Sequence, residues 1–345
     1  MNYIGSKHSI LNFLEESIVD FTKMENGIFC DIFAGTGVVG KYFKTLGYDV
    51  IANDNQYYSY VLNKHYLENN GELKFNTLKQ KGIDDVFIYL NKIEGVQKFI
   101  TDNYTQEGTL KKEYERKYFT YNNALKIDAI RDQIEKWYKT EWINKEEYFY
   151  LLSCLLEAAD RVANTASVYE AFLKEFKRSA QNDLELKPID IVVNKKTKNK
   201  VYIEDANGLI KRIKGDILYL DPPYNVRKYS SNYHMLETIA LCDCPTIKGK
   251  TGIRTDGIKS LFNNKNKVAE ALENLIKDAK FKYIFLSYND EGILSLNEIE
   301  NIMQKYGRYY RYEKNHKRYK ANKDKETTKK TTIEYLHALE KIEGV

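Results

Sequence analysis

Short apolar runs separated by polar segments mark the strands of a predicted sheet. They cover residues 28–34, 49–52, 200–205, 216–221 and 282–288. Each run is nearly continuous and has the length of a strand, which is typical of strands buried on both faces of a parallel sheet. A helical pattern over Val38–Leu46, closed by Gly47, separates the first two runs and predicts a strand, helix, strand unit.

The long region between the second and third runs has a different period. Its pattern is helical, and within residues 148–176 apolar side chains recur three and four residues apart. The strands therefore come from both sides of a helical insertion. We predict an α/β fold in which residues 1–70 and 197–345 form the sheet core and residues 71–196 form an inserted helical lobe.

Composition narrows the class of protein. A chain of 345 residues can bury one large core and carry an inserted lobe. We expect a cytoplasmic protein, because neither end resembles a targeting segment and no window approaches the roughly 18 apolar residues of a membrane span. We also expect reduced thiols and no metal site, because no zinc-ligand spacing occurs among Cys30, Cys154, Cys242 and Cys244.

Positive charge is concentrated in two segments of the chain. Residues 305–330 hold eleven Lys or Arg against three acids, and residues 245–267 hold six against one. Basic clusters interleaved with tyrosine suit a phosphate backbone and stacked bases, whereas a solvated face explains the charge equally well. We expect the glycine- and lysine-rich loop at 248–260 to become ordered only when nucleic acid binds.

A glycine loop follows the first strand. Gly35, Gly37 and Gly40 form G-x-G-x-x-G between a strand and a helix, with Asp54 at the distance expected of a dinucleotide fold. Asp31 argues against that ligand, because a carboxylate beside the loop would repel a pyrophosphate. Bulky side chains also crowd the turn, namely Phe33 and Thr36.

S-adenosylmethionine suits the same loop better. It has no phosphates and carries a sulfonium and an amino group, so the carboxylate of Asp31 becomes favourable. Asp54 can then accept hydrogen bonds from the ribose hydroxyls. Asp205, at the end of the third strand, can accept from the adenine amino group. Helix capping is the alternative role for each of these aspartates.

Two of the four prolines in the chain stand together after the fourth strand. Asp221 ends that strand, and Pro222 and Pro223 stiffen the turn that follows it, since proline fixes φ and restricts the preceding residue. The carboxyl ends of parallel strands are where ligands bind in such folds. The turn therefore presents a carboxylate and a carbonyl oxygen to an amino group, with Tyr224 behind them as a stacking face.

With these motifs the chain resembles the Dam-like, alpha-group DNA adenine N6-methyltransferases of restriction-modification systems. The resemblance covers most of the chain and rests on "NYIGSK" (2–7), "DIFAGTG" (31–37), "ND" (53–54), "ED" (204–205) and "DPPY" (221–224). A further motif, "FLSYNDEG" (285–292), resembles one branch of that class. The resemblance implies a Rossmann-like, S-adenosylmethionine-dependent methyltransferase sheet whose helical insertion is the target-recognition domain.

The resemblance also implies the roles of individual residues. Asp221 and the Pro222 carbonyl would accept the amino hydrogens of a flipped-out adenine, braced by Pro223, and Tyr224 would stack on the base. Neither a covalent intermediate nor a metal is required. The residues expected to bind S-adenosylmethionine are Tyr3, Lys7, Asp31, Phe33, Gly35, Thr36, Gly37, Asp54, Asn55, Asp205, Ala206 and Asp221.

Double-stranded DNA is the expected partner, and a cognate restriction endonuclease stays open as a second one. The candidate DNA contacts are Arg227, Lys228, Tyr229, Tyr233, Lys174, Arg254, Lys259, Lys317 and Arg318. His234 is interpreted as a hydrogen-bonded residue at a helix start rather than as a general base.

Several alternatives share parts of this pattern. Methylation of RNA adenine or of the N4 amino group of cytosine uses the same acceptor pair. A non-catalytic nucleic-acid-binding protein on the same scaffold predicts a broken glycine loop or DPPY motif, and both are intact. If the chain were a nicotinamide oxidoreductase, the paired prolines and the basic segment would have no evident function.

Overall fold

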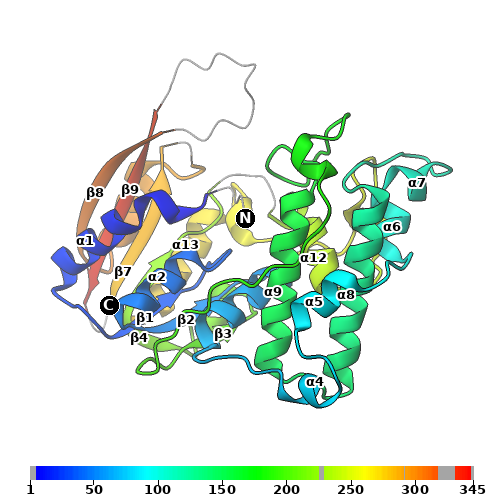
Figure 1. Ribbon diagram of the computed structural model, residues 1–345. Helices are drawn as coiled ribbons and strands as arrows, with labels where there is room; N and C mark the ends of the chain where they lie inside the picture. The colour runs from blue at the N-terminus through cyan, green and yellow to red at the C-terminus, as the bar shows by residue number, and fades with distance from the viewer. Residues whose placement is uncertain (1–4, 225–228, 291, 318–330, 343–345) are drawn as a thin grey trace. The chain divides into compact units, whose positions relative to one another are not determined.

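The computed structural model describes residues 5–224, 229–290, 292–317 and 331–342 (Figure 1). Their contacts divide the chain into two compact units. Within the described residues, the sheet unit comprises 5–68, 192–224 and 258–342, and the helical unit comprises 69–191 and 229–257. Across these residues, no helix is both long and apolar enough to cross a membrane.

The sheet unit is built on seven strands in the order β3-β2-β1-β4-β7-β9-β8. β3, β2, β1, β4 and β7 are mutually parallel, and β9 runs antiparallel to both β7 and β8. The bounds are β1 (Ile28–Asp31), β2 (Asp49–Asn53), β3 (Lys200–Tyr202), β4 (Lys214–Leu220), β7 (Lys280–Asn289), β8 (Gly307–Lys317) and β9 (Thr331–Lys341). The five predicted strands are therefore confirmed as one parallel set.

Helices cover both faces of this sheet, as the nearly continuous apolar strands require. The helices and short helical turns of the unit are η1 (Lys7–Ile10), α1 (Leu11–Thr22), α2 (Val38–Leu46), α3 (Tyr57–Asn63), η2 (Lys64–Glu68), α10 (Ala206–Leu209), η4 (Leu261–Asn263), α13 (Val268–Asp278) and α14 (Leu296–Gln304). Side chains such as Ile217 and Tyr219 pack with α1 and α2, while Leu218 and Leu220 pack with α13 and α14. Successive residues of β4 thus serve opposite faces.

β1 and β4 lie side by side at the point where the strand order reverses. From β1 the chain builds β2 and β3 on one side, and from β4 it continues to β7 on the other. Ligands of open α/β sheets bind beyond the carboxyl ends of the strands at such a point. Asp31, the last residue of β1, and Asp221, which follows β4, both occupy it.

The two strands at the edge of the sheet are not among the predicted ones. β8 and β9 pair along their whole length, from Gly307 opposite Lys341 to Lys317 opposite Thr331. The residue pattern of this region indicates only a basic segment. Tyrosines of β8 contact neighbouring elements: the hydroxyl of Tyr309 lies 2.9 Å from Nδ1 of His337 on β9, and that of Tyr312 donates to Asp20 on α1.

The helical unit packs around two long helices that follow each other in the chain, α8 and α9. Thr120 caps α8, and Asn144 and Glu147 form a reciprocal capping box at the start of α9. The elements of the unit are α4 (Asn76–Gln80), α5 (Val86–Lys92), α6 (Phe99–Tyr104), α7 (Gln106–Thr109), α8 (Tyr121–Lys139), α9 (Lys145–Val162), η3 (Arg178–Gln181), α11 (Tyr229–Asn232), α12 (His234–Leu241), β5 (Ile247–Lys248) and β6 (Ile253–Arg254).

The helix expected within residues 148–176 is shorter than its pattern indicates. α9 ends at Val162, and Asn164 organises the chain that follows. Its side-chain amide donates to the backbone carbonyls of Lys117 and Leu173. Its side-chain oxygen Oδ1 accepts from the backbone amide of Lys177 at 3.0 Å. An asparagine that satisfies backbone groups in this way competes with the helix.

Residues 229–257, which the sequence pattern assigns to the sheet core, have most of their contacts in the helical unit. The loop at 248–260 includes the hairpin β5–β6, and Arg116 donates to the carbonyls of Gly249 and Lys250. Tyr104 donates to the carbonyl of Gly252. The expectation that this loop is ordered only by nucleic acid is therefore wrong for the hairpin, because side chains of its own unit already hold it.

Candidate active site

Asp31 is a buried carboxylate at the end of β1. The residue is 1% exposed, and its Oδ1 has no hydrogen-bond partner among the described residues. Burial, reinforced by the charges of Asp221 and Asp54, raises the pKa of Asp31 well above its ordinary value. A buried acceptor without a donor is uncommon in folded proteins, so Asp31 is a candidate ligand-binding residue.

The glycine loop is held in place by the helix that follows β2. The Gly35 amide donates to Oδ2 of Asp54 at 2.9 Å, and the Gly35 carbonyl accepts from Ser59 and Asn63 of α3. Gly37 has a φ of +78°, and a Cβ added there would lie 2.7 Å from Oδ1 of Asn63. Only glycine fits this position without displacing the helix.

The other predicted cofactor residues lie around the same strand ends. Asp54 is half-buried and also accepts from the Gln56 amide through Oδ1, and Asn55 follows it. Asp205 is exposed and caps α10 by accepting from the Gly208 amide, while Ala206, the first residue of α10, is buried. The capping alternative thus describes the local geometry of Asp205.

Lys7 lies between two carboxylates. Its Nζ is 3.0 Å from Oδ1 of Asp221 and 2.9 Å from Oε1 of Glu334 on β9, and the lysine is buried. Burial opposes its charge, yet the two carboxylates hold the pKa of Lys7 well above its usual value. For Asp221, burial outweighs the Lys7 charge and, together with Glu334, raises the pKa to about 6.

The remainder of the DPPY turn is fixed by its neighbours. Pro222 is buried, and Pro223 and Tyr224 are half-buried. The Tyr224 carbonyl accepts from the Ile293 amide at 2.9 Å, and the Tyr224 ring meets the ring of Tyr288 edge to face at 6.1 Å. Nζ of Lys7 lies 5.8 Å from the centre of the Tyr224 ring. Lysine, carboxylate and aromatic ring are thus gathered at one turn.

Several predicted residues lie elsewhere in the structure or outside it. Phe33 is half-buried against the ring of Phe262, and Thr36 is half-buried in the glycine loop. Lys174 and Lys259 are exposed, and Tyr229 is half-buried. Lys317 is the last residue of β8. The predicted residues outside the described ranges are Tyr3, Arg227, Lys228 and Arg318.

Two candidate DNA contacts are already engaged within the protein. Tyr233 is fully buried and stacks on Tyr229 with ring centres 6.2 Å apart. Arg254 is 5% exposed, and its guanidinium donates to both Asp243 and Asp256 at 2.6–3.0 Å. The geometry therefore corrects the sequence prediction at these two positions, because neither side chain is presented to a phosphate or a base.

His234 matches its sequence interpretation. It is the first residue of α12, fully buried, and its Nε2 lies 2.9 Å from the Tyr169 carbonyl. Burial lowers its pKa to about 4, so the imidazole is neutral at physiological pH. Its hydrogen bond connects α12 to the segment after α9, which confirms a structural helix-start histidine.

Glu334 and Ser287 are absent from the residues that the sequence predicts for the site. Glu334 lies on a strand that the sequence does not predict, so nothing in the residue pattern indicates that it belongs to the site. Ser287 belongs to the "FLSYNDEG" motif, and its hydroxyl donates to Oε1 of Glu334 at 2.7 Å. The serine of that motif is the one available hint of this contact in the sequence.

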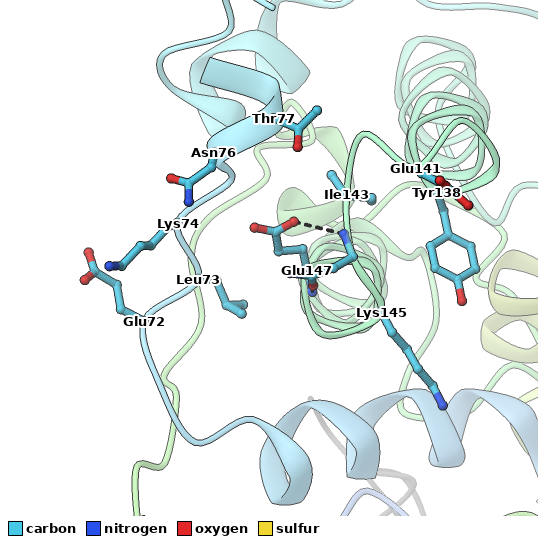
Figure 2. Close-up of a pocket in the computed structure, with 11 residues that line it drawn as sticks. Glu72, Leu73, Lys74, Asn76, Thr77, Tyr138, Glu141, Ile143, Lys145 and Glu147 are labelled. Atoms are coloured by element: carbon cyan, nitrogen blue, oxygen red, sulfur yellow. Dashed lines mark hydrogen bonds between the residues drawn. The ribbon is translucent and has the colours of Figure 1, made fainter. Parts of the chain in front are cut away.

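The helical unit also contains a cavity of about 680 Å³ near the start of α9. Figure 2 marks the hydrogen bond in which the carboxylate of Glu147 accepts from the backbone amide of Asn144 in this capping box. Lys74 and Glu72 extend from the opposite segment. Glu147 also accepts from the Phe75 amide at 2.7 Å. Of the predicted site residues that the structure describes, none lines this cavity. We therefore assign no function to it.

The chain matches, over residues 3–302, the family described as D12 class N6 adenine-specific DNA methyltransferase. The chain belongs to this family. The methyltransferase is 46% identical over 346 residues to the Type II methyltransferase M.NlaIII of Neisseria lactamica, with 99% of each chain covered. It is 34% identical to the Type II methyltransferase M.CviAII of Paramecium bursaria Chlorella virus 1, with 89% of each chain covered.

A third relative is longer than this methyltransferase. The Type II methyltransferase M.FokI of Planomicrobium okeanokoites is 43% identical over 89% of the present chain, and the match spans 47% of that protein. Membership of the D12 family confirms the predicted reaction class, N6 methylation of adenine in DNA, and selects it among the alternatives that the residues leave open. The family and the fold also imply S-adenosylmethionine as the methyl donor.

Proposed function

We propose that this D12 methyltransferase acts on an adenine flipped out of a specific site in double-stranded DNA, as the modification enzyme of a type II restriction-modification system. The single observation that carries the site assignment is the position of Asp31 and Asp221 at adjacent strand ends, where the strand order reverses. The restriction-modification role is supported by relatives named Type II methyltransferases. A cognate endonuclease is proposed as the functional partner.

The residues at the strand ends fit S-adenosylmethionine. The donor-free Oδ1 of Asp31 is an acceptor suited to a positively charged amino group, which would supply the missing hydrogen bond. When bound, the molecule supplies a methyl group activated by its sulfonium. The residues proposed to hold it are Tyr3, Lys7, Asp31, Phe33, Gly35, Thr36, Gly37, Asp54, Asn55, Asp205, Ala206 and Asp221.

Asp221 and the Pro222 carbonyl are proposed to accept the two amino hydrogens of the adenine. Nζ of Lys7 contacts Oδ1 of Asp221, so we propose that Oδ2 is the atom that accepts from the base. With its pKa at about 6, the carboxylate is mostly ionised at neutral pH and can act as an acceptor. Pro223 stiffens the turn, and Tyr224 stacks on the base, so catalysis depends chiefly on orientation.

The helical unit is proposed to be the target-recognition domain, since its larger part, residues 69–191, lies between the glycine loop and the DPPY motif. An adenine amino group cannot be reached inside the stacked duplex, so recognition must be coupled to base flipping. Because Tyr233 and Arg254 are engaged within the protein, we leave them out of the interface. The residues that remain proposed DNA contacts are Lys174, Arg227, Lys228, Tyr229, Lys259, Lys317 and Arg318.

The test is expression in a host that lacks adenine methylation, followed by modification-sensitive sequencing of its DNA. We expect N6-methyladenine within one short motif in the wild type, and unmodified DNA with Asp221→Ala. DNA isolated from the wild-type culture should resist an endonuclease that cuts the same motif. N4-methylcytosine, or unmodified DNA from folded protein, would overturn the proposal.

A further inference from the structure

A chain of buried polar contacts extends from the proposed catalytic carboxylate to the edge of the sheet. Nζ of Lys7 contacts Oδ1 of Asp221, and the same Nζ contacts Oε1 of Glu334. Glu334 in turn accepts from the hydroxyl of Ser287 at 2.7 Å. Lys7, Glu334 and Ser287 are all buried, so the contacts of Lys7 with Glu334 and of Glu334 with Ser287 are shielded from water.

Burying charged side chains such as these contributes little to the stability of a fold. Two carboxylates share one ammonium, and desolvating three charges offsets most of their mutual attraction. Apolar side chains of similar volume often stabilise a core as well or better. The strands offer apolar neighbours, since Phe285 and Leu336 are both fully buried. The arrangement is therefore better explained by a task at Asp221 than by folding.

We infer that Glu334 is a positioning residue for methyl transfer, which acts by holding Lys7 against Oδ1 of Asp221. Ser287 fixes the carboxylate of Glu334, and Glu334 fixes the ammonium. A lysine tethered to one carboxylate alone could rotate around it, whereas a lysine held from both sides keeps Asp221 in one orientation. This inference rests on the proposed role of Asp221.

The charges around Asp221 make the inference measurable. The ionisable groups that face Asp221 or its lysine are Lys7, Glu334, Asp31, Tyr219 and Tyr224. Glu334 raises the pKa of Asp221 and Lys7 lowers it. Neutralising either residue should therefore move the acid limb of the pH profile, and the two shifts should have opposite signs.

The experiment measures single-turnover methylation against pH for the full chain and for Glu334→Gln, at saturating DNA and S-adenosylmethionine. We expect the plateau rate to fall by about ten- to a hundredfold, because a misaligned reacting group loses rate steeply. The acid limb should move to lower pH in Glu334→Gln and to higher pH in Lys7→Gln. Ser287→Ala should shift the limb as Glu334→Gln does, by less.

The control is Glu147→Gln in the helical unit. Glu147 is a carboxylate of similar burial that accepts two backbone amides, so its loss tests general damage to the protein. We expect it to lower the melting temperature without moving the acid limb. S-adenosylmethionine binding, measured by calorimetry, should be retained in Glu334→Gln, which separates positioning from unfolding.

The outcomes distinguish this inference from the proposed function. A wild-type plateau and acid limb in folded Glu334→Gln, while Asp221→Ala is inactive, would overturn the inference alone. Full activity in Asp221→Ala would overturn the catalytic assignment on which it rests. An equal limb shift in Glu147→Gln would also overturn the inference, because the shift would then reflect general damage.

Discussion

Nζ of Lys7 lies 3.0 Å from Oδ1 of Asp221, which joins the first helical turn of the sheet unit to the turn after β4. The lysine is buried and the Asp221 side chain is 19% exposed, so the lysine charge acts on the carboxylate with limited screening by solvent. Two segments far apart in the sequence are thereby tied at the place where the chemistry is proposed to occur.

The pH dependence of methyl transfer follows from Asp221. Its pKa of about 6 lies above the ordinary value, so protonation occurs at a higher pH than for an exposed aspartate. The protonated acid is a poorer acceptor, and we expect the single-turnover rate to be level above about pH 7 and to fall about tenfold per unit below about pH 6. Circular dichroism at each pH checks folding, and a level profile down to about pH 5 would contradict the assignment.

Removing the lysine should reverse the usual pH dependence of stability at this site. In Lys7→Met the buried carboxylate of Glu334 and the largely covered carboxylate of Asp221 lose their ammonium, which should destabilise the protein by about 3–5 kcal/mol at neutral pH. The folded-state pKa of Asp221 rises further without the lysine, so this penalty should shrink as pH falls through that raised value.

Denaturant unfolding of Lys7→Met at two pH values measures this. The matched control is Lys98→Met, whose ion pair with Asp132 is largely exposed and should contribute no more than about 1 kcal/mol. A loss of stability in Lys7→Met that is small and independent of pH would argue against a buried charge network.

The catalytic and cofactor-binding roles should separate in Asp221→Ala. We expect methyl transfer to be abolished while S-adenosylmethionine binding is largely retained, because Asp31 and the glycine loop remain intact. Isothermal calorimetry and a methylation assay on the same preparation decide this. Retained turnover with lost binding would mean that the strand ends are assigned wrongly.

Substitution of Gly37 should impair the cofactor loop specifically. Gly37→Ala introduces both a left-handed backbone penalty and a clash with Asn63, so we expect a loss of at least about tenfold in S-adenosylmethionine affinity. Gly47→Ala is the matched control, because Gly47 also has positive φ, at +100°, but its Cβ would meet nothing within 4 Å. Equal affinities for the two variants would show that the clash does not matter.

Arg254 should behave as a structural residue and Lys259 as a DNA contact. Arg254→Met removes charged hydrogen bonds to Asp243 and Asp256, and we expect it to destabilise the protein by about 1–3 kcal/mol. Lys259→Ala should leave the melting temperature unchanged and reduce the salt dependence of DNA binding by about one phosphate contact. The reverse result would restore Arg254 to the interface.

The sequence predicts the parts of this protein whose signals are local. Buried parallel strands appear as apolar runs, and the turns after β1 and β4 carry glycines, prolines and acids with few other uses. The positions of Asp31 and Asp221 at the strand ends therefore follow from the residue pattern alone. The early end of α9 does not, because it depends on Asn164 finding carbonyls from distant segments.

The missed features depend on contacts across long sequence distances. β8 contains tyrosines and charges on both faces, so nothing local distinguishes it from a solvated segment until β9 pairs with it. Glu334 resembles any surface glutamate in the sequence, and only the pairing of β9 with β7 brings it to Lys7. Burial of Tyr233 and Arg254 likewise arises from packing within the helical unit, where α12 and the β5–β6 hairpin meet.

The position of β9 between β7 and β8 has a consequence for how the enzyme is made. Until residues through Lys341 have been synthesised, β7 is paired on its β4 side only and β8 lacks its partner, and Glu334 arrives only with β9. A nascent chain that already carries the glycine loop and the DPPY turn would still lack the carboxylate that holds Lys7. Such a chain should transfer methyl groups more slowly than one that includes β9, because Lys7 would be held by Asp221 alone.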